Sequence, residues 1–318
     1  MYYEWKEKIF EQYVKSISDD MNQFGIYPIN DNSEIGKELI CNNIFGTNDN
    51  EAILKIFNSN QETAIIVGYG GNSYLHMGHL LLANEILFYL RKIPKCKIYF
   101  VNFDVDTEHT FVEKICNIVS NNIDYEIVDY HNIEAMKLKK KISKITNVNT
   151  INRVMGWKNE CIESYEKTID MITTFSLSNI LSEQQSIIIS DINQKTFYTL
   201  FKSIQDKLEL NGINCFLYHM LIPSLKAPNQ RMSIKDSKSI LFMDDNIEII
   251  ESKLRKSFTG VEDKQYTCSM LRVLDLLVQN AETEKIIEDC IHNNNYCSLC
   301  KNKNIENIKN QILCRRKK

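Results

Sequence analysis

A glycine-containing loop that ends in two histidines stands between a short apolar run and an amphipathic stretch. It reads Gly-Tyr-Gly-Gly-Asn-Ser-Tyr-Leu-His-Met-Gly-His from Gly68 to His79. Open α/β sheets bind ligands where a strand passes into a helix, and a helix N-terminus offers unpaired N–H groups to phosphates. His76 and His79 would donate to an α-phosphate, and Gly78 would let a nucleoside approach the backbone. The loop therefore predicts a nucleotide site, with a structural loop and two helix-capping histidines as the alternative.

A second loop, residues 223–239, carries cations among serines. Its basic side chains include Arg231, Lys235 and Lys238. Nucleotidyl transfer from ATP expels pyrophosphate, and mobile cations stabilise the charge that builds on the leaving phosphates. We expect Arg231 and Lys235 to supply that charge, so that the two loops close over one triphosphate. Taken by itself, the segment is also typical of a charged surface loop.

Four cysteines near the end of the chain have the spacing of metal ligands. The pattern C-x21-C-x6-C-x2-C comprises Cys268, Cys290, Cys297 and Cys300. Four thiolates can hold zinc or a [4Fe–4S] cluster, and the spacing alone does not choose between them. Thiols without a metal are the alternative.

The composition is that of a folded chain with a sizeable core. Of 318 residues, 43% are hydrophobic and 25% are charged, enough for one core and a smaller domain. No apolar stretch reaches the roughly 18 residues of a membrane span, and residues 1–10 lack the apolar segment of a signal peptide. We therefore expect a cytoplasmic protein without membrane contact, whose cysteines are thiols or metal ligands.

Apolar runs alternate with amphipathic stretches, which is typical of an α/β fold with a doubly wound parallel sheet. The expected strands lie at 63–67, 96–103, 125–128, 186–189 and 213–217. The expected helices lie at 78–92, 109–119, 133–181, 195–210 and from 246 onward. The predicted domains are an N-terminal helical extension (1–60), an α/β domain (61–245) with a helical insertion (about 130–182), and a helical C-terminal domain (246–318).

The histidine loop resembles the His-Ile-Gly-His motif of class I aminoacyl-tRNA synthetases, and the wider pattern is closest to the tryptophanyl-tRNA synthetase family. In that family the loop runs Gly-x-x-Pro-Ser-Gly-x-Leu/Ile-His-x-Gly-His. The matching residues here are Gly68, Leu75, His76, Gly78 and His79. Three residues depart from the pattern, because Gly71, Asn72 and Ser73 replace Pro, Ser and Gly.

The cation loop is similar to the family's Lys-Met-Ser-Lys-Ser loop. Arg231 replaces the first Lys, and Ile234-Lys235 replaces Lys-Ser or Ala-Ser. The family's next residues are matched at similar spacing by Asp236, Ser239, Leu241, Phe242 and Asp245, and then by Phe258-Thr259-Gly260.

The resemblance implies a Rossmann-like (HUP) sheet with an all-helical, anticodon-binding C-terminal domain. The implied activity is that of a ligase in protein biosynthesis, which uses ATP and Mg²⁺ to activate tryptophan and transfers it to tRNA(Trp). A homodimer is implied as well. The implied catalytic residues are His76, His79, Arg231 and Lys235, and the implied ATP-binding residues are Gly68, Gly78, Met232 and Ser233.

The amino-acid pocket implied by the resemblance contains Tyr69, Asp170 and Gln194. Asp170 stands on the helix that forms this pocket in the family, where a carboxylate can accept from an indole N–H. Gln194 ends a stretch, residues 191–194, that is similar to the family's Gly/Ala-Ile-Asp-Gln turn near the amino group and ribose. Asn193 replaces the Asp of that turn.

The resemblance also bears on the cysteines. Some bacterial tryptophanyl enzymes carry a [4Fe–4S] cluster on a cysteine pattern that differs from this one by one residue in the first gap. The implied role of Cys268, Cys290, Cys297 and Cys300 is to bind such a cluster, which would hold the C-terminal helices together.

Basic segments are candidate contacts for tRNA, although the net charge of −3 argues neither way. Seven Lys or Arg residues and one acid lie between 301 and 318, and a second group comprises Lys137, Lys139, Lys140 and Lys141. A frayed terminus and a solvated helix face are the alternatives.

Three other functions stay open. One is a synthetase paralogue that activates another amino acid for a biosynthetic acceptor. Another is a catalytically weak sensor of tRNA or an amino acid. The third is a different nucleotidyltransferase that shares the histidine motif.

Overall fold

A computed structural model gives the fold of the chain. The residues that it describes are 2–70, 74–102, 110–119, 123–129, 133–156, 162–181, 185–210, 213–227, 230–233, 236–259, 268–277, 281–293 and 297–316.

A seven-stranded sheet with the order β1-β2-β7-β6-β3-β4-β5 forms the centre of the molecule. The strands are β1 (Tyr27–Pro28), β2 (Ile44–Thr47), β3 (Thr63–Tyr69), β4 (Cys96–Asn102), β5 (Tyr125–Val128), β6 (Gln185–Asp191) and β7 (Ile213–His219). The last five are mutually parallel, which confirms the predicted doubly wound sheet. β1 and β2 extend the sheet in antiparallel fashion beyond β7.

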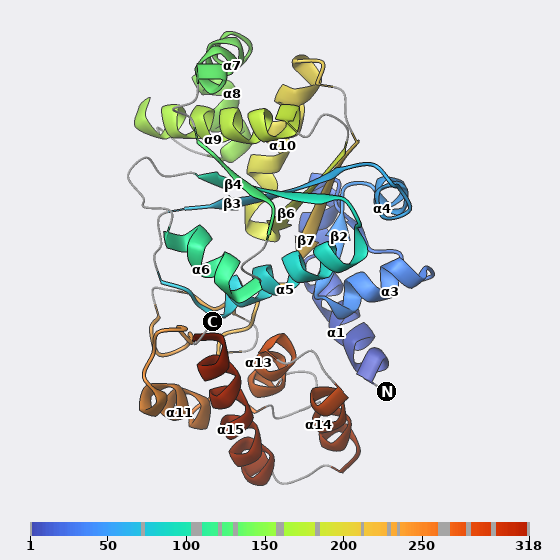
Figure 1. Ribbon diagram of the computed structural model, residues 1–318, viewed down its shortest axis with the longest axis vertical. Helices are drawn as coiled ribbons and strands as arrows, with labels where there is room; N and C mark the ends of the chain where they lie inside the picture. The colour runs from blue at the N-terminus through green and yellow to red at the C-terminus, as the bar shows by residue number, and fades with distance from the viewer. Residues whose placement is uncertain are drawn as a thin grey trace.

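Helices cover both faces of the sheet and form a separate layer at the C-terminal end (Figure 1). Those of the first part are α1 (Tyr2–Ser16), α2 (Ser18–Phe24), α3 (Glu34–Cys41), α4 (Asn50–Phe57), α5 (Met77–Lys92) and α6 (Thr110–Val119). The insertion and the end of the α/β part give α7 (Ile133–Ile145), α8 (Val148–Met155), α9 (Ile162–Leu181), the short 3-10 turn η1 (Ile192–Gln194) and α10 (Lys195–Lys207). The C-terminal helices are α11 (Ile247–Arg255), α13 (Ser269–Leu277), α14 (Ala281–Asn293) and α15 (Cys297–Arg316).

The central strands are buried on both sides, which explains why they read as continuous apolar runs. Residues 63–67 of β3 are all buried, as are residues 185–190 of β6. A parallel strand covered by helices on both faces needs apolar side chains at successive positions rather than at alternate ones. In Figure 1, α9 and α10 lie on one side of the sheet, and α5 and α6 lie on the other.

The N-terminal segment contains two strands that the sequence did not predict. β1 has only two residues, too few for a period-two pattern to emerge, and the four residues of β2 include Gly46, a residue that strands disfavour. β2 is also irregular, because its register against β7 shifts between Ile44 and Gly46. A Cβ atom at Gly46 would lie 2.9 Å from the Ile26 side chain, so glycine permits this close packing.

A buried polar network joins the N-terminal helix to the C-terminal helices. Lys6 of α1 and Asp275 of α13 form an ion pair of 2.5 Å with both side chains fully buried. Tyr2 donates from its hydroxyl to Asp275 at 2.6 Å, and Lys6 also donates to Asn43 at 3.2 Å. These contacts fix α13 against the α/β part of the molecule.

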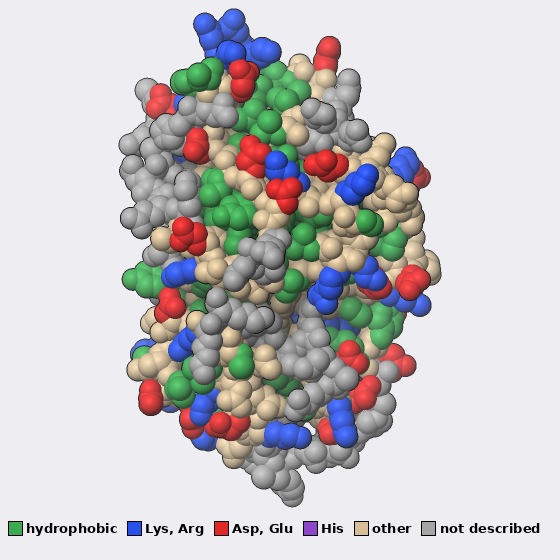
Figure 2. Space-filling model, in the orientation of Figure 1, with side chains coloured by type: hydrophobic (Ala, Val, Ile, Leu, Met, Phe, Trp, Pro, Cys, Tyr) green, Lys and Arg blue, Asp and Glu red, His purple; other side chains and the backbone are tan. Residues whose placement is uncertain are grey.

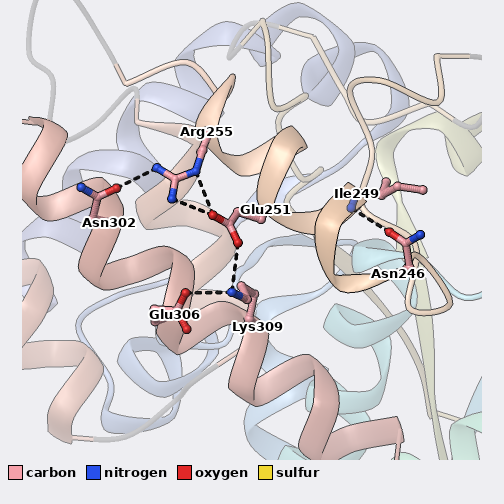
Figure 3. Close-up of polar contacts among 7 residues, drawn as sticks. All are labelled: Asn246, Ile249, Glu251, Arg255, Asn302, Glu306 and Lys309. Atoms are coloured by element: carbon pink, nitrogen blue, oxygen red, sulfur yellow. Dashed lines mark hydrogen bonds and ion pairs between the residues drawn. The ribbon is translucent and has the colours of Figure 1, made fainter.

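Exposed charges join α11 to α15 (Figure 3). Glu251 accepts from Arg255 on its own helix at 2.6 Å and from Lys309 of α15 at 3.1 Å. Arg255 also donates to Asn302 of α15 at 2.9 Å. Surface pairs of this kind contribute little individually, but they orient the two helices. Within the described part of the chain, no helix combines the length and apolarity needed to cross a membrane.

Candidate active site

A cleft with a volume of about 430 Å³ opens at the carboxyl ends of the parallel strands. Its walls come from the start of α5, the ends of β3, β6 and β7, and residues 231–233. β3 pairs with β4 on one side and with β6 on the other, so the strand order reverses at this point. Open α/β sheets bind ligands at such a reversal.

The cleft brings together most of the residues that the sequence singled out. Those that line it are Gly68, His76, Gly78, His79, Gln194, Arg231, Met232 and Ser233. Lys235 lies outside the described residues. Two predicted amino-acid-binding residues, Tyr69 and Asp170, are described by the structure but do not line this cleft.

The two histidines cap the N-terminus of α5 with each other's help. His76 is the N-cap residue, and its Nδ1 accepts from the backbone N–H of Gly78 at 3.0 Å. His79 reaches back, and its Nδ1 accepts from the backbone N–H of His76 at 3.1 Å. The rings stack with their centroids 3.9 Å apart. Since each Nδ1 accepts, each neutral ring carries its proton on Nε2 and is a donor there.

Burial keeps both imidazoles uncharged at neutral pH. It lowers the pKa of His76 to about 4. It also lowers the pKa of His79 to about 3, with a smaller contribution from His76. The histidines therefore offer the cleft two neutral N–H donors rather than two positive charges.

Two aromatic rings, those of Tyr69 and Phe111, pack in series against the ring of His79. Tyr69 stacks on Phe111 of α6 with centroids 5.1 Å apart, and Phe111 meets His79 edge-on at 5.1 Å. Burial raises the pKa of Tyr69 to about 12, so its hydroxyl stays protonated. Tyr69, predicted to contact the amino acid, is 4% exposed, and its ring stacks on Phe111.

Gly78 is required by the histidine pair itself. A Cβ atom at this position would lie 2.8 Å from Cε1 of His76 and 3.1 Å from its Nδ1. Such contacts would displace the ring that caps α5. The glycine therefore permits the cap as well as the predicted close approach of a nucleoside.

Backbone contacts join the two predicted loops. His76 forms an isolated antiparallel bridge with Phe242. Met243 donates its N–H to the carbonyl of Leu75 at 2.7 Å, and Met77 donates to Leu241 at 3.3 Å. The segment that follows the cation loop is thereby bonded to the segment that precedes α5.

The cation loop begins with a second isolated bridge, between Pro223 and Arg231. Met232 donates its N–H to the carbonyl of Ile222 at 2.9 Å. This pairing holds the exposed Arg231 at the wall of the cleft that also contains His79. A guanidinium there can bind phosphate oxygens bidentately.

Gln194 presents a donor to the cleft. Its Oε1 accepts from the backbone N–H of Asp191 at 3.4 Å and from the Tyr198 hydroxyl at 3.4 Å. The amide NH₂ group has no partner among the described residues, so it can donate to a hydroxyl, carboxylate or phosphate oxygen of a ligand. An ammonium group would need an acceptor instead, so this orientation favours contact with ribose or a carboxylate over contact with the amino group.

The carboxylate of Asp170 binds a lysine rather than lining the cleft. Its carboxylate forms an ion pair with Lys139 of α7, and 21% of its side chain is exposed. The sequence placed both residues on helices but gave no sign that α7 and α9 would bring them together. In this arrangement a cation neutralises the carboxylate that was predicted to read an amino-acid side chain.

The sequence analysis did not single out three titratable residues, namely His219 and Asp191 at the cleft and Glu85 beside His219. His219 and Asp191 line it, at the last positions of β7 and β6, where they are register partners. The side chain of Glu85, on α5, is 1% exposed, and its Oε1 lies 3.5 Å from Nδ1 of His219. A titratable residue at the last position of a buried strand is a signal that could have found His219 and Asp191, whereas no local signal points to Glu85 on α5.

The four cysteines lie on three neighbouring helical elements. Cys268 directly precedes α13 and is 7% exposed, and Cys290 lies partly buried on α14. Cys297 and Cys300 stand in the first turn of α15, but their side chains are outside the described part. α13 contacts both α14 and α15. Among the side chains described, no three His, Cys, Asp or Glu residues converge as a metal site.

The candidate tRNA contacts are partly engaged within the protein. Lys301 donates to the carbonyl of Ser257 at 2.9 Å, Lys309 pairs with Glu251 and Glu306, and Arg316 donates to backbone carbonyls of Met243 and Asp245. By contrast, Figure 2 shows a group of Lys and Arg side chains at the end of the molecule where α7 lies.

The comparisons with known proteins agree on one kind of relative. No protein-family model matches the chain. The tryptophan–tRNA ligase of Methanocaldococcus jannaschii is 23% identical over 96% of this chain and 91% of that protein. A solved tryptophanyl-tRNA synthetase from Aeropyrum pernix matches with a TM-score of 0.77 and 17% identity, over 96% of this chain and 93% of that one.

A tyrosyl-tRNA synthetase from Archaeoglobus fulgidus, solved in complex with L-tyrosine, matches with a TM-score of 0.68 and 14% identity, over 90% of this chain and 99% of that one. All three proteins are thus aminoacyl-tRNA ligases by name, and the two solved structures share the fold of this chain. The chain is therefore a distant relative of a tryptophan–tRNA ligase and has the class I aminoacyl-tRNA synthetase fold.

Proposed function

We propose that the chain is an aminoacyl-tRNA synthetase that activates an amino acid with Mg-ATP in the cleft described above. The observation that carries this proposal is the presence of His79 and Arg231 in the walls of one cleft. Donors at a helix N-terminus and a cation opposite them are what a triphosphate requires. The sequence relationship to a tryptophan–tRNA ligase supports the same activity.

The chemistry needs no covalent bond to the protein. The amino-acid carboxylate attacks the α-phosphorus of ATP in line, and the bond to the β-phosphate oxygen breaks as pyrophosphate leaves. His76 and His79 donate from Nε2 to the α-phosphate oxygens as negative charge builds there. Arg231 holds the departing pyrophosphate, together with Lys235, and Mg²⁺ enters as part of the ATP substrate.

The remaining cleft residues orient the nucleotide. Gly68 and Gly78 let it approach the backbone, and Met232 and Ser233 contact it from the cation loop. The amide NH₂ of Gln194 donates to a ribose or carboxylate oxygen. This division of roles makes catalysis a matter of positioning and charge stabilisation.

Tryptophan is the leading substrate because the sequence relative and the solved structure with the higher TM-score are both tryptophanyl enzymes. One observation favours another amino acid instead. Asp170, the proposed acceptor for an indole N–H, is paired with Lys139. A paralogue that activates a different amino acid for a biosynthetic acceptor is therefore the second candidate.

We further propose that tRNA is the acceptor and that the protein works as a cytoplasmic homodimer, as the resemblance implies. Lys140 and Lys141, both exposed on α7, are the favoured tRNA contacts, because Lys137 and Lys139 of the same helix form ion pairs and Lys301, Lys309 and Arg316 bind other groups within the protein.

We also retain the [4Fe–4S] cluster as a proposal. The helices that carry Cys268, Cys290, Cys297 and Cys300 are neighbours, and the burial of Cys268 suits a sheltered cluster. Such a cluster would hold α13, α14 and α15 together and take no part in amino-acid activation. Iron and sulfide analysis of anaerobically purified protein, with its visible spectrum, tests this. A colourless protein that contains zinc would reject it.

Charging of total tRNA with each of the twenty labelled amino acids tests the overall function. The expected result is acid-precipitable tryptophan that depends on ATP. Charging with another single amino acid would refute tryptophan but keep the synthetase. Adenylate formation without charging of any tRNA would identify the biosynthetic paralogue, and ATP binding without turnover would identify a sensor.

A further inference from the structure

A buried carboxylate that the proposed reaction does not yet use lies beside His219, a residue that lines the cleft. Glu85 is 1% exposed, and neither of its carboxylate oxygens has a hydrogen-bond partner among the described residues. An isolated carboxylate in such a place is costly unless a proton or a cation compensates it. On α5, Glu85 stands four residues after Leu81 and three after Leu82, two residues that line the cleft, so it shares their face of the helix.

The compensating group is the imidazole of His219. Its Nδ1 lies 3.5 Å from Oε1 of Glu85, and that nitrogen is likewise buried without another partner in the described structure. His219 lines the cleft, and 17% of its side chain is exposed. Because Nδ1 faces Glu85, Nε2 is the ring nitrogen that could reach a ligand.

The charges around this pair favour a proton on each ring nitrogen. Burial alone would lower the pKa of His219, but Glu85 from α5 and Asp191 from β6 raise it overall. Burial in turn raises the pKa of Glu85, and His219 opposes that rise. The other titratable group beside Glu85 is the buried Tyr89 hydroxyl, one turn further along α5. A proton is thus shared between Glu85 and Nδ1, and Nε2 remains a donor in either form.

The pair lies away from the phosphate end of the cleft. Glu85 follows His79 by six residues, which corresponds to about 9 Å along a helix axis. Apolar side chains, including Leu82, Met220 and Ile222, line the cleft near the end of β7. An apolar wall with one N–H donor fits a nucleoside, whereas the triphosphate faces the helix N-terminus and Arg231.

We propose that His219 is a nucleoside-binding residue of this cleft, which donates from Nε2 to a neutral acceptor atom of the ATP base or ribose. Glu85 is the positioning residue that holds the ring by its Nδ1 proton. Only the identification of the ligand as ATP rests on the proposed function.

The test follows the His219 ring by NMR in protein labelled with ¹⁵N-histidine, across pH, with AMP, ribose 5-phosphate or pyrophosphate as separate probes. AMP is expected to shift the Nε2 resonance and to raise the pH at which His219 titrates. Ribose 5-phosphate distinguishes the two parts of the nucleoside, since it reproduces the AMP shift only if ribose is the acceptor. A shift with pyrophosphate and none with AMP would overturn the proposal.

Variants separate binding from structural roles. His219→Phe is expected to weaken AMP binding about tenfold, and His219→Gln, which keeps a donor near the Nε2 position, should recover part of that loss. AMP affinity should fall at high pH, where His219 loses its proton. In Glu85→Gln this fall should occur at a lower pH, because the carboxylate that favours the proton on His219 is absent. Glu134→Gln, at an exposed position of α7, is the matched control and should leave the profile unchanged.

The outcomes distinguish this proposal from the proposed function. Unchanged AMP affinity in His219→Phe, or a wild-type His219 resonance that ignores AMP, overturns the role of His219 even if amino-acid activation is found. A His219 response to AMP without activation of any amino acid supports the role of His219 and refutes the synthetase. The wild-type titration decides the matter if a variant fails to fold.

Discussion

His79 accepts the backbone N–H of His76 through its Nδ1 atom at 3.1 Å, and the two imidazole rings stack 3.9 Å apart. This contact fixes which nitrogen of each ring faces the cleft. A pair of histidines that could have been mobile cations is instead a rigid pair of neutral donors at the start of α5.

Removal of the donor of His79 should slow amino-acid activation much more than it weakens ATP binding. His79→Ala is expected to lower the rate of adenylate formation by about 10²–10³-fold, the usual effect of losing one donor to a developing charge. Single-turnover kinetics measure this. His79→Gln should retain more activity than His79→Ala; equal rates in both variants and in wild type would refute the assigned role.

Arg231 should act as a cation that binds the leaving group. Arg231→Ala is expected to reduce the activation rate by about 10²-fold, and Arg231→Lys should restore most of it because the charge returns. The steady-state rate at saturating ATP is the measurement. Lys226→Ala, an exposed substitution on the same loop, is the matched control. A similar loss in the control would mean that the loop acts through its overall charge.

The histidine pair should make the fold sensitive to acid. The folded-state pKa values of about 4 for His76 and about 3 for His79 lie below the value near 6.5 in an unfolded chain. The unfolded chain therefore binds more protons in this range, so the stability contributed by the two neutral rings is present above pH 6.5 and is lost progressively toward pH 3. Urea unfolding at several pH values should show a shallower decline for His79→Gln; an unchanged slope would contradict the burial of the ring.

Gly78→Ala should disturb the cap rather than the helix as a whole. The added Cβ meets the His76 ring at 2.8 Å, so the ring must move and its hydrogen bond to the backbone of residue 78 is lost. The expected cost in free energy of unfolding is about 1–2 kcal/mol. In a His76→Asn background the same substitution should cost less, because the clashing ring is absent. Additive costs in thermal unfolding would argue against the clash.

The buried Lys6–Asp275 pair should be important for docking α13. Asp275→Asn leaves Lys6 charged and buried and is expected to lower the free energy of unfolding by about 3–5 kcal/mol. Chemical denaturation measures the change. The double variant Lys6→Met/Asp275→Met should recover much of the loss. If its loss of unfolding free energy instead equalled the sum of the losses in Lys6→Met and Asp275→Met, the two residues would not act as a pair.

The sequence predicted the parallel sheet because each central strand is covered on both faces. Residues 64–67 and 187–189 had to be continuously apolar, and this pattern is visible without any tertiary information. The histidine loop was visible for a similar local reason, since its glycine, its caps and the helix that follows are all within one stretch of chain. β1 was missed because a strand of two residues shows no period, and β2 because Gly46 interrupts its short apolar run.

The remaining site residues depend on contacts that no local pattern encodes. Glu85 meets His219 only because α5 packs across the end of β7. Asp170 was predicted to read a substrate, but the packing of α7 on α9 gives it Lys139 as a partner. Tyr69 likewise stacks on Phe111, and the sequence does not reveal that Phe111 contacts His79.

Exchange of labelled pyrophosphate into ATP tests the central claim most directly, because it requires adenylate formation in the cleft to run in both directions. The account predicts exchange that depends on one amino acid, with tryptophan first among the candidates, and that falls steeply in both His79→Ala and Arg231→Ala. Absence of exchange with each of the twenty amino acids, in protein that binds Mg-ATP, would contradict it.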